Sequence, residues 1–336
     1  MVDSSVQTDK TLSEVHDRLS PVQAAALVLG RYGALIALAS LVIYFSLASP
    51  YFLAVGNLLQ ILNQASLGTI IAGGLTVVLA GGHFDLSIGY MASLSGIITT
   101  SLMLLGVPIP LAILAAIFAG GVVGIVNGFL VTKVGVNALV ATLGTGSVLI
   151  GINYLISSGV PIAVAADYPR FLDISIGNWL GIPRPIFYMA AATVVLWVML
   201  NKTDFGRNVR AIGGNREAAM LSGVSVDAVT TSTFVVAGCC ASITGILLAS
   251  TVGGGQPTGG DNYTLTSFAA AFVGSTVLRE GQFHILGTLV GGVTVATGFN
   301  GLALIGVPSF VQFLFQGLLL IAAVALSSGG RRLVRH

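Results

Sequence analysis

Few side chains in this 336-residue sequence could take part in proton transfer, nucleophilic attack or metal binding. Its two cysteines, Cys239 and Cys240, are adjacent within an apolar run, which disfavours both a disulfide framework and a four-ligand metal site. His83 has no partner at metal-ligand spacing. We therefore expect no catalytic centre and no metal site, and we interpret both cysteines as small apolar packing residues.

The composition indicates which solvent surrounds these residues. Hydrophobic residues make up 55% of the chain and charged residues only 8%, whereas a soluble domain carries roughly 25% charged residues. The 44 glycines suit transmembrane helices, where small residues let backbones approach closely. The net charge of +2, with no basic run interleaved with aromatic residues, argues against a nucleic-acid partner. The lipid bilayer is the expected surroundings of the chain.

Apolar runs of membrane-spanning length predict an all-α polytopic protein of about ten transmembrane helices. The runs cover residues 31–49, 57–80, 86–105, 110–131, 138–157, 186–200, 228–252, 264–278, 285–305 and 310–328. The sixth and eighth runs are short. Gly73–Val77 is loosely repeated at Gly291–Val295, which suggests an internal pseudo-repeat of the kind that transporters use.

The basic residues test this count, because cytoplasmic loops carry the excess of Lys and Arg. With ten spans and the first entering from the cytoplasm, only Arg170 and Arg184 of the 14 basic residues fall outside. The cytoplasmic set is Lys10, Arg18, Arg31, Lys133, Lys202, Arg207, Arg210, Arg216, Arg279, Arg331, Arg332 and Arg335. This sorting predicts that both termini are cytoplasmic.

The domain organisation follows from these spans. Residues 1–30 are expected to form a polar cytoplasmic tail with no signal peptide, 31–328 the transmembrane domain, and 329–336 a basic cytoplasmic tail. The longest outer loop, 158–185, is interpreted either as a lid or docking surface or as a plain connection.

One inner segment, residues 201–227, concentrates charge in an otherwise apolar chain. Within it, Glu217–Ser222 favours a short helix that Gly223 ends. Such a helix, with Met220 and Leu221 on one side, suits insertion into a groove of a partner protein. The alternative is a helix that only lies on the membrane surface.

The same segment carries a family resemblance. Glu217-Ala218-Ala219 followed by Gly223 matches the EAA-x-x-x-G motif of bacterial ABC importer permeases. Thr203–Arg207 and Ala211–Asn215 resemble the corresponding loop of the ribose-type sugar permeases. The resemblance implies that this coupling loop (201–227) docks into an ATP-binding subunit. Its implied contact residues are Arg207, Gly213, Gly214, Asn215, Glu217, Ala218, Ala219 and Gly223.

The resemblance extends over about 290 residues. Gly81–Gly89 is similar to the GG-x-DLS-x-G segment of these permeases, and Asn127-Gly128 and Ala141–Thr145 to their NG and ATLGT segments. Where the family has a second glycine-rich turn, this chain has Arg279-Glu280.

The implied machine is a bacterial inner-membrane importer. It would contain an ATP-binding cassette ATPase subunit, a second permease chain that is identical or different, and a periplasmic or surface solute-binding protein. This chain has no G-x-x-x-x-G-K-[ST] phosphate loop, so ATP and Mg²⁺ would be bound by the partner and no cofactor by this chain. The implied substrate is a sugar or sugar-like solute such as a pentose, hexose or polyol.

Asp85 is the one acid near membrane depth. It follows Gly81-Gly82 and precedes Ser87, so we interpret it as an N-cap carboxylate of the next helix, with Gly82 and Ser87 as structural neighbours. The alternative is a carboxylate that couples protons or ions to transport.

Uncharged amides are the other polar groups in the spans. They could hydrogen-bond helix to helix or line a path for a hydroxyl-rich solute. The path residues that we predict are Asn63, Asn127, Asn153, Asn300 and Phe299.

Three rival functions remain open at this stage. An ion-coupled secondary transporter would also show repeats and broken helices, and a membrane-embedded enzyme would need clustered acids or histidines. Within the ABC class, the substrate could be a branched-chain amino acid.

Overall fold

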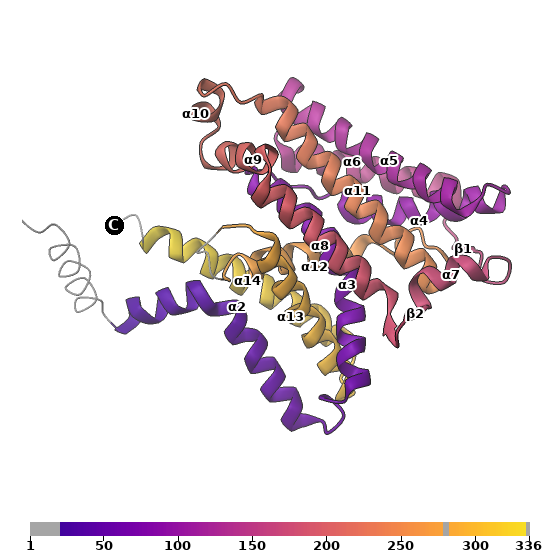
Figure 1. The fold of residues 1–336 in the computed structure, drawn as a ribbon, viewed down its shortest axis with the longest axis horizontal. Coiled ribbons are helices and arrows are strands. Elements are labelled where there is room, and N and C mark those ends of the chain that lie inside the picture. Colours follow the sequence, from indigo (N-terminus) through magenta and orange to yellow (C-terminus); the bar gives the residue numbers. More distant parts are fainter. Residues whose placement is uncertain (1–20, 278–281, 334–336) are drawn as a thin grey trace, which may run out of the picture.

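The computed structural model describes residues 21–277 and 282–333 of the chain, with side chains described for 32–277 and 282–325. The Arg279-Glu280 pair therefore lies outside the described residues. The chain is built almost entirely of helices (Figure 1). The larger helices are α2 (Pro21–Ala48), α3 (Val55–Ala80), α4 (Ile88–Leu104), α5 (Ile109–Phe129), α6 (Ala138–Ser157), α8 (Arg184–Lys202), α11 (Val226–Val252), α12 (Asp261–Gly274), α13 (Ile285–Leu304) and α14 (Phe310–Leu333).

Short elements join the larger helices. A π-helical turn, η1 (Leu130–Val134), ends α5. The remaining elements are α7 (Pro169–Ile176), α9 (Asp204–Gly214), α10 (Arg216–Leu221) and four two-residue strands, β1 (Ile162–Ala163), β2 (Asn178–Trp179), β3 (Ile182–Pro183) and β4 (Gly254–Gly255). The antiparallel pairs β1–β4 and β2–β3 are an exception to the predicted all-α class.

Each of the ten predicted apolar runs overlaps one of the larger helices, although α2 begins at Pro21, within the predicted N-terminal tail 1–30. Six described helices are long and apolar enough to cross a membrane, namely Val55–Ala80, Ile109–Val134, Ala138–Ser157, Arg184–Lys202, Val226–Val252 and Ile285–Leu304. The described apolar stretches Tyr32–Ala48 of α2, Ile88–Leu104 (α4) and Phe310–Ala325 of α14 have fewer than 18 residues, and α12 has only 14. The chain is thus a polytopic helical membrane protein, while the count of ten spans and the cytoplasmic position of both termini stay predictions.

Burial distinguishes central helices from those at the periphery. Of the most apolar 18 residues of each span, 83% are buried in α3, whereas 22% are buried in the span formed by α5 and η1. Most exposed side chains of that span are large and apolar, including Leu114 and Phe118. We infer that this face of α5 contacts lipid and that α3 and α11 form the interior.

Close backbone contacts fix α11 against its neighbours. A Cβ atom added to Gly238 of α11 would overlap the carbonyl oxygen of Gly120 in α5, and one added to Gly245 would overlap that of Ala92 in α4. In a bilayer, helices gain little from the hydrophobic effect when they associate, so such close van der Waals contact carries the packing.

The predicted pseudo-repeat segments lie on neighbouring helices. Gly73–Val77 belongs to α3 and Gly291–Val295 to α13, and the two helices are joined by a hydrogen bond of 2.6 Å between the hydroxyls of Thr76 and Thr288. Whether the segments are true repeats stays a prediction.

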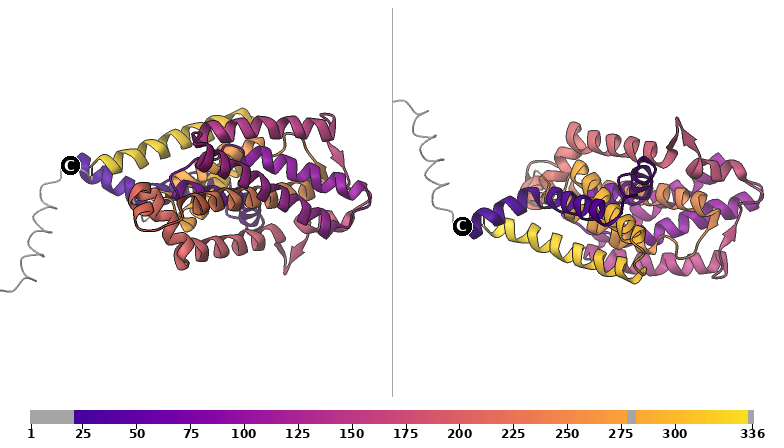
Figure 2. Two further views of the ribbon diagram at one scale, coloured as in Figure 1. Left: turned by 90° about the horizontal axis from the view of Figure 1, so that it is seen from above. Right: turned by 90° about the horizontal axis from the view of Figure 1, so that it is seen from below.

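The molecule has two distinct ends. In Figures 1 and 2, α9 and α10 lie at the same end as the start of α2 and the last turns of α14, whereas α7 and the β-strand pairs lie at the opposite end. Lys133, Arg207 and Arg216 belong to the first end and Arg184 to the second. This division matches the sorting of basic residues on which the predicted orientation depends.

The α5–α11 contact yields a stability prediction. Replacing Gly238 with Leu should separate the helices and cost about 1–3 kcal/mol or more, because overpacking a close contact forces the backbones apart. The measurement is the thermal unfolding midpoint of the detergent-solubilised protein. Gly151→Leu on α6 is the control, since a Cβ there meets nothing within 4 Å. Equal midpoints for the two variants would contradict the packing argument.

Candidate functional site

The coupling loop forms two consecutive short helices that are capped by their own side chains. Thr203 Oγ1 accepts a hydrogen bond from the Gly206 N–H at 3.3 Å, and Asn215 Oδ1 accepts one from the Ala218 N–H at 3.0 Å. These bonds satisfy backbone donors that a helix start leaves free. At the other end of α10, Gly223 has a φ of +84°, a conformation that favours glycine. The short helix predicted around Glu217 is thereby confirmed.

Some of the predicted coupling residues support the loop rather than face outward. Ala219 is buried and packs with Ile212 and Val226, which joins α9, α10 and the start of α11. A Cβ atom on Gly213 would overlap the carbonyl oxygen of Ala80, so this glycine lets α9 lie against the end of α3. These contacts give the loop a fixed position on the bundle.

The other predicted coupling residues are exposed. They are Arg207, Gly214, Asn215, Glu217, Ala218 and Gly223, and Gly213 is exposed as well. Next to them, the side chains of Met220 and Leu221 are 61% and 85% exposed, although both are apolar. An exposed apolar pair on a fixed short helix has the form of a docking element.

An ion cluster at the base of α10 was not anticipated from sequence. The Asp227 carboxylate lies 2.8 Å from Lys133 Nζ and 3.7 Å from Arg216 Nη2. All three side chains are at least 40% exposed, so each pair contributes only about 0–1 kcal/mol. The ion cluster therefore positions the segments more than it stabilises the fold, because it brings η1, α10 and α11 together. On α9, Arg207 pairs with Asp204.

An apolar groove also adjoins α10, and no sequence signal predicted it. Its volume is about 740 Å³, and its walls come from the end of α5, η1, α10 and the start of α11. Ile125, Phe129, Met220 and Val226 are among its lining residues, with Lys133 and Asp227 at the polar side.

Asp85 does not cap α4 in the predicted way. The N-cap position belongs to Ser87, whose side chain makes no capping bond, and α4 begins at Ile88. Asp85 Oδ1 instead accepts hydrogen bonds from the Ser87 N–H (2.9 Å) and hydroxyl (2.6 Å), which closes the turn before the helix. The predicted cap is therefore displaced by two residues, and the carboxylate is buried and hydrogen-bonded locally.

The rest of this turn contacts the coupling loop. Gly82 has a φ of +82°, and its backbone lies beside Gly213 of α9. Burial lowers the pKa of His83, and the positive charge of Arg216 lowers it further. Both effects favour the neutral form of the His83 imidazole.

The predicted path amides share one property in the structure. In each of Asn63, Asn127, Asn153 and Asn300, the Oδ1 atom is buried and accepts no hydrogen bond from the described residues. Buried polar atoms without partners are rare in native proteins, so a set of four on four different helices calls for a reason.

Two of the amides lie close to the same helix end, and the other two belong to a pair of packed helices. Asn127 donates to the Ser87 hydroxyl (2.9 Å) and Asn153 to the Tyr90 carbonyl (3.3 Å), so both lie at the start of α4. Asn63 and Asn300 belong to α3 and α13, which pack together. The ring of Phe299 lies 6.2 Å from that of Phe315 in α14, edge to face. No contact of the described residues joins the five predicted path residues into one continuous lining.

Comparison with known proteins identifies the family of this chain. The family model described as "Branched-chain amino acid transport system / permease component" matches residues 57–324. The ribose import permease protein RbsC of Bacillus subtilis is 38% identical over 299 residues, which cover 89% of this chain and 93% of that protein. No solved structure matches this chain.

Two further relatives differ in the sugar that they are named for. The D-allose transport system permease protein AlsC of Escherichia coli is 33% identical over 304 residues, covering 90% of this chain and 92% of the relative. The L-arabinose transport system permease protein AraH of Escherichia coli is 35% identical over 294 residues, covering 88% and 89%. The chain therefore belongs to the branched-chain amino acid transport system permease family.

Proposed function

We propose that this chain is the membrane-spanning permease subunit of an ATP-binding cassette importer for a sugar or sugar-like solute. The observation that carries the proposal is the position of α10: an exposed apolar pair on a short, capped helix that is packed onto the start of the central helix α11. The relatives named for ribose, allose and arabinose support a pentose or hexose as the substrate.

The partners follow from this role. An ATPase subunit binds ATP and Mg²⁺ and receives α10, while a second permease chain, identical or different, completes the pathway. A solute-binding protein delivers the sugar to the end of the molecule that carries α7. The complex resides in the inner (plasma) membrane of a bacterium, with the coupling loop in the cytoplasm.

The amides give the proposed pathway its selectivity. Four buried carbonyl oxygens offer acceptors to the hydroxyl donors of a neutral sugar, whereas a cation would favour a string of carboxylates. An ion-coupled secondary transporter needs neither α10 nor a partner, and its uptake would collapse when an ionophore removes the ion gradient.

Docking through α10 can be tested on an exposed side chain. Leu221→Asp should leave the protein folded, since Leu221 is 85% exposed. It should nevertheless release the ATPase subunit, because it would place a charge against the apolar surface of the ATPase subunit that receives α10. Leu180→Asp at the opposite end is the matched control, with its leucine 98% exposed. Co-purification of the ATPase subunit is the measurement. If Leu221→Asp retains the subunit and normal uptake, α10 is not the docking element.

The orientation can be tested with the same two positions. In a Cys239→Ala/Cys240→Ala background, a cysteine at position 180 should react with a membrane-impermeant maleimide in intact cells. A cysteine at position 221 should react only after the membrane is opened. The reverse pattern would place α10 outside and would overturn the proposed function.

Asn300 distinguishes a packing amide from a path amide. Asn300→Leu should keep or raise the unfolding midpoint, because it removes a buried acceptor without a partner, which costs about 1–3 kcal/mol. Uptake of labelled D-ribose, D-allose or L-arabinose should nonetheless fall, with a higher KM. Unchanged uptake of the transported sugar would assign Asn300 to packing.

A further inference from the structure

The helix α7 is anchored at the end of the molecule opposite the coupling loop. It lies in the segment that connects α6 to α8 (Figure 1). Phe171 is fully buried and packs in a cluster with Met103 of α4 and with Ile246 and Ala249 of α11. The segment is therefore part of the packed structure and not a loose connection.

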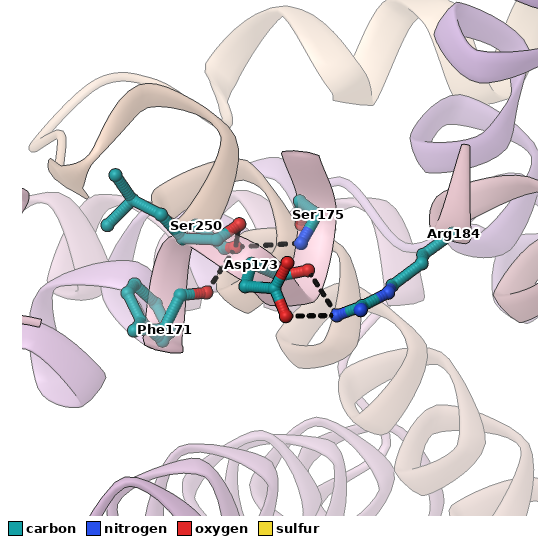
Figure 3. A network of polar contacts seen from close by, with 6 residues as sticks. Phe171, Asp173, Ser175, Arg184 and Ser250 are labelled. Carbon is teal, nitrogen blue, oxygen red and sulfur yellow. Dashed lines mark hydrogen bonds and ion pairs between the residues drawn. The ribbon is translucent and has the colours of Figure 1, made fainter. Parts of the chain in front are cut away.

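Two buried serines fasten α7 to the last turns of α11. The Ser250 hydroxyl donates to the Phe171 carbonyl at 2.7 Å and accepts a hydrogen bond from the Ser175 N–H at 3.0 Å (Figure 3). The Ser175 hydroxyl donates to the Leu247 carbonyl at 2.9 Å. Because these groups are buried, losing one partner leaves a polar group with neither protein nor water to bind.

A strand pair extends this attachment beyond the end of α11. β1 pairs with β4, and the Val164 N–H donates to the Gly253 carbonyl at 3.0 Å. The segment before α7 is thus hydrogen-bonded to the residues that follow α11, so this segment and α7 itself are both attached to the same end of α11.

A second set of contacts fastens α7 to the first residue of α8. Arg184 Nη1 donates to both the backbone carbonyl and the carboxylate of Asp173, each at 2.6 Å (Figure 3). The guanidinium also lies 5.4 Å from the centre of the Trp179 ring. Two hydrogen bonds and a ring contact fix the direction of this side chain, since the planar guanidinium satisfies all three at once.

The other ends of α8 and α11 carry the coupling loop. α8 continues into α9 after one residue, and α10 leads into α11 through a short turn in which the Val224 N–H donates to the Ala219 carbonyl at 3.1 Å. Between the two ends, α3 packs against both helices: a Cβ on Gly73 would meet Leu196 of α8, and one on Gly74 would meet Cys240 of α11. The helices α8 and α11 are therefore connected at both ends and supported along their length.

We propose that α7 is a brace that makes α8 and α11 move as one unit, with Ser250, Ser175 and Arg184 as positioning residues. When the ATPase subunit displaces α10, α8 and α11 then move together, and the end of the molecule that carries α7 moves with them. By thermodynamic linkage, binding of the solute-binding protein at the α7 end acts on the coupling loop through the same unit. This inference rests on the proposed function.

The first test separates basal from stimulated ATP hydrolysis. The complex with its ATPase subunit is reconstituted in nanodiscs, and the solute-binding protein is added with D-ribose, D-allose or L-arabinose. Ser250→Ala should keep basal hydrolysis and lose about fivefold or more of the stimulation, the lower end of typical coupling between sites. Ser95→Ala on α4 is the matched control, because this serine is also fully buried and its hydroxyl donates within its own helix, to the Met91 carbonyl at 2.8 Å. Stimulation of Ser250→Ala equal to wild type would overturn the brace.

The second test replaces the hydrogen bonds with a covalent bond, in case Ser250→Ala does not fold. Ser175→Cys/Ser250→Cys is made in the Cys239→Ala/Cys240→Ala background and oxidised. If α7 and α11 move as one unit, the disulfide preserves uptake and stimulation, and reduction weakens the stimulation. A disulfide that blocks uptake, or one that does not form, would contradict the proposal.

The wild-type complex distinguishes failure of the brace from failure of the proposed function. If no ATPase subunit co-purifies, or if the solute-binding protein never stimulates hydrolysis by wild type, the importer assignment fails. If wild type is stimulated and Ser250→Ala is stimulated equally, only the brace fails.

Discussion

The close backbone contact of α11 with α4 and α5 determines where the other elements can lie. Lipid tails are as apolar as leucine, so helix association in a bilayer depends on van der Waals contact rather than on removal of apolar surface from water. Gly120, Gly238 and Gly245 remove the side chains that would hold the helices apart. Because α11 runs from α10 at one end to α7 at the other, its position sets the place of both.

The coupling loop shows how a short helix becomes a fixed surface. A six-residue helix is unstable alone, since nucleation is costly and few hydrogen bonds repay it. Here Asn215 caps its start, Gly223 allows its end, and Ala219 anchors its inner face. Met220 and Leu221 can then remain exposed without loosening the helix. A partner that binds them has no loop to order first, which reduces the entropic cost of association.

Local sequence signals predicted the elements that local chemistry controls. The apolar runs predicted the ten larger helices, and the Glu217–Gly223 pattern predicted α10, because length, propensity and a terminal glycine are properties of neighbouring residues. The cap of α4 was misplaced by two residues, since Asp85 bonds to the turn rather than to the helix.

Contacts between distant residues were beyond sequence reasoning. α7 owes its place to Ser250, which is 79 residues from Phe171, and the Lys133–Asp227 pair joins residues 94 apart. The groove beside α10 likewise needs three separate segments. None of these leaves a periodic or compositional signal in its own stretch of chain.

The buried polar groups of the helices indicate which kind of solute the interior suits. A buried acid is costly in a bilayer. The carboxylate of Asp85 accepts hydrogen bonds from both the backbone N–H and the hydroxyl of Ser87, so its partners come from its own turn. The amide oxygens of Asn63, Asn127, Asn153 and Asn300 are not committed to any described residue. Such uncharged amide oxygens accept hydrogen bonds from hydroxyl donors. A neutral solute with several hydroxyl groups is the chemistry that would satisfy them.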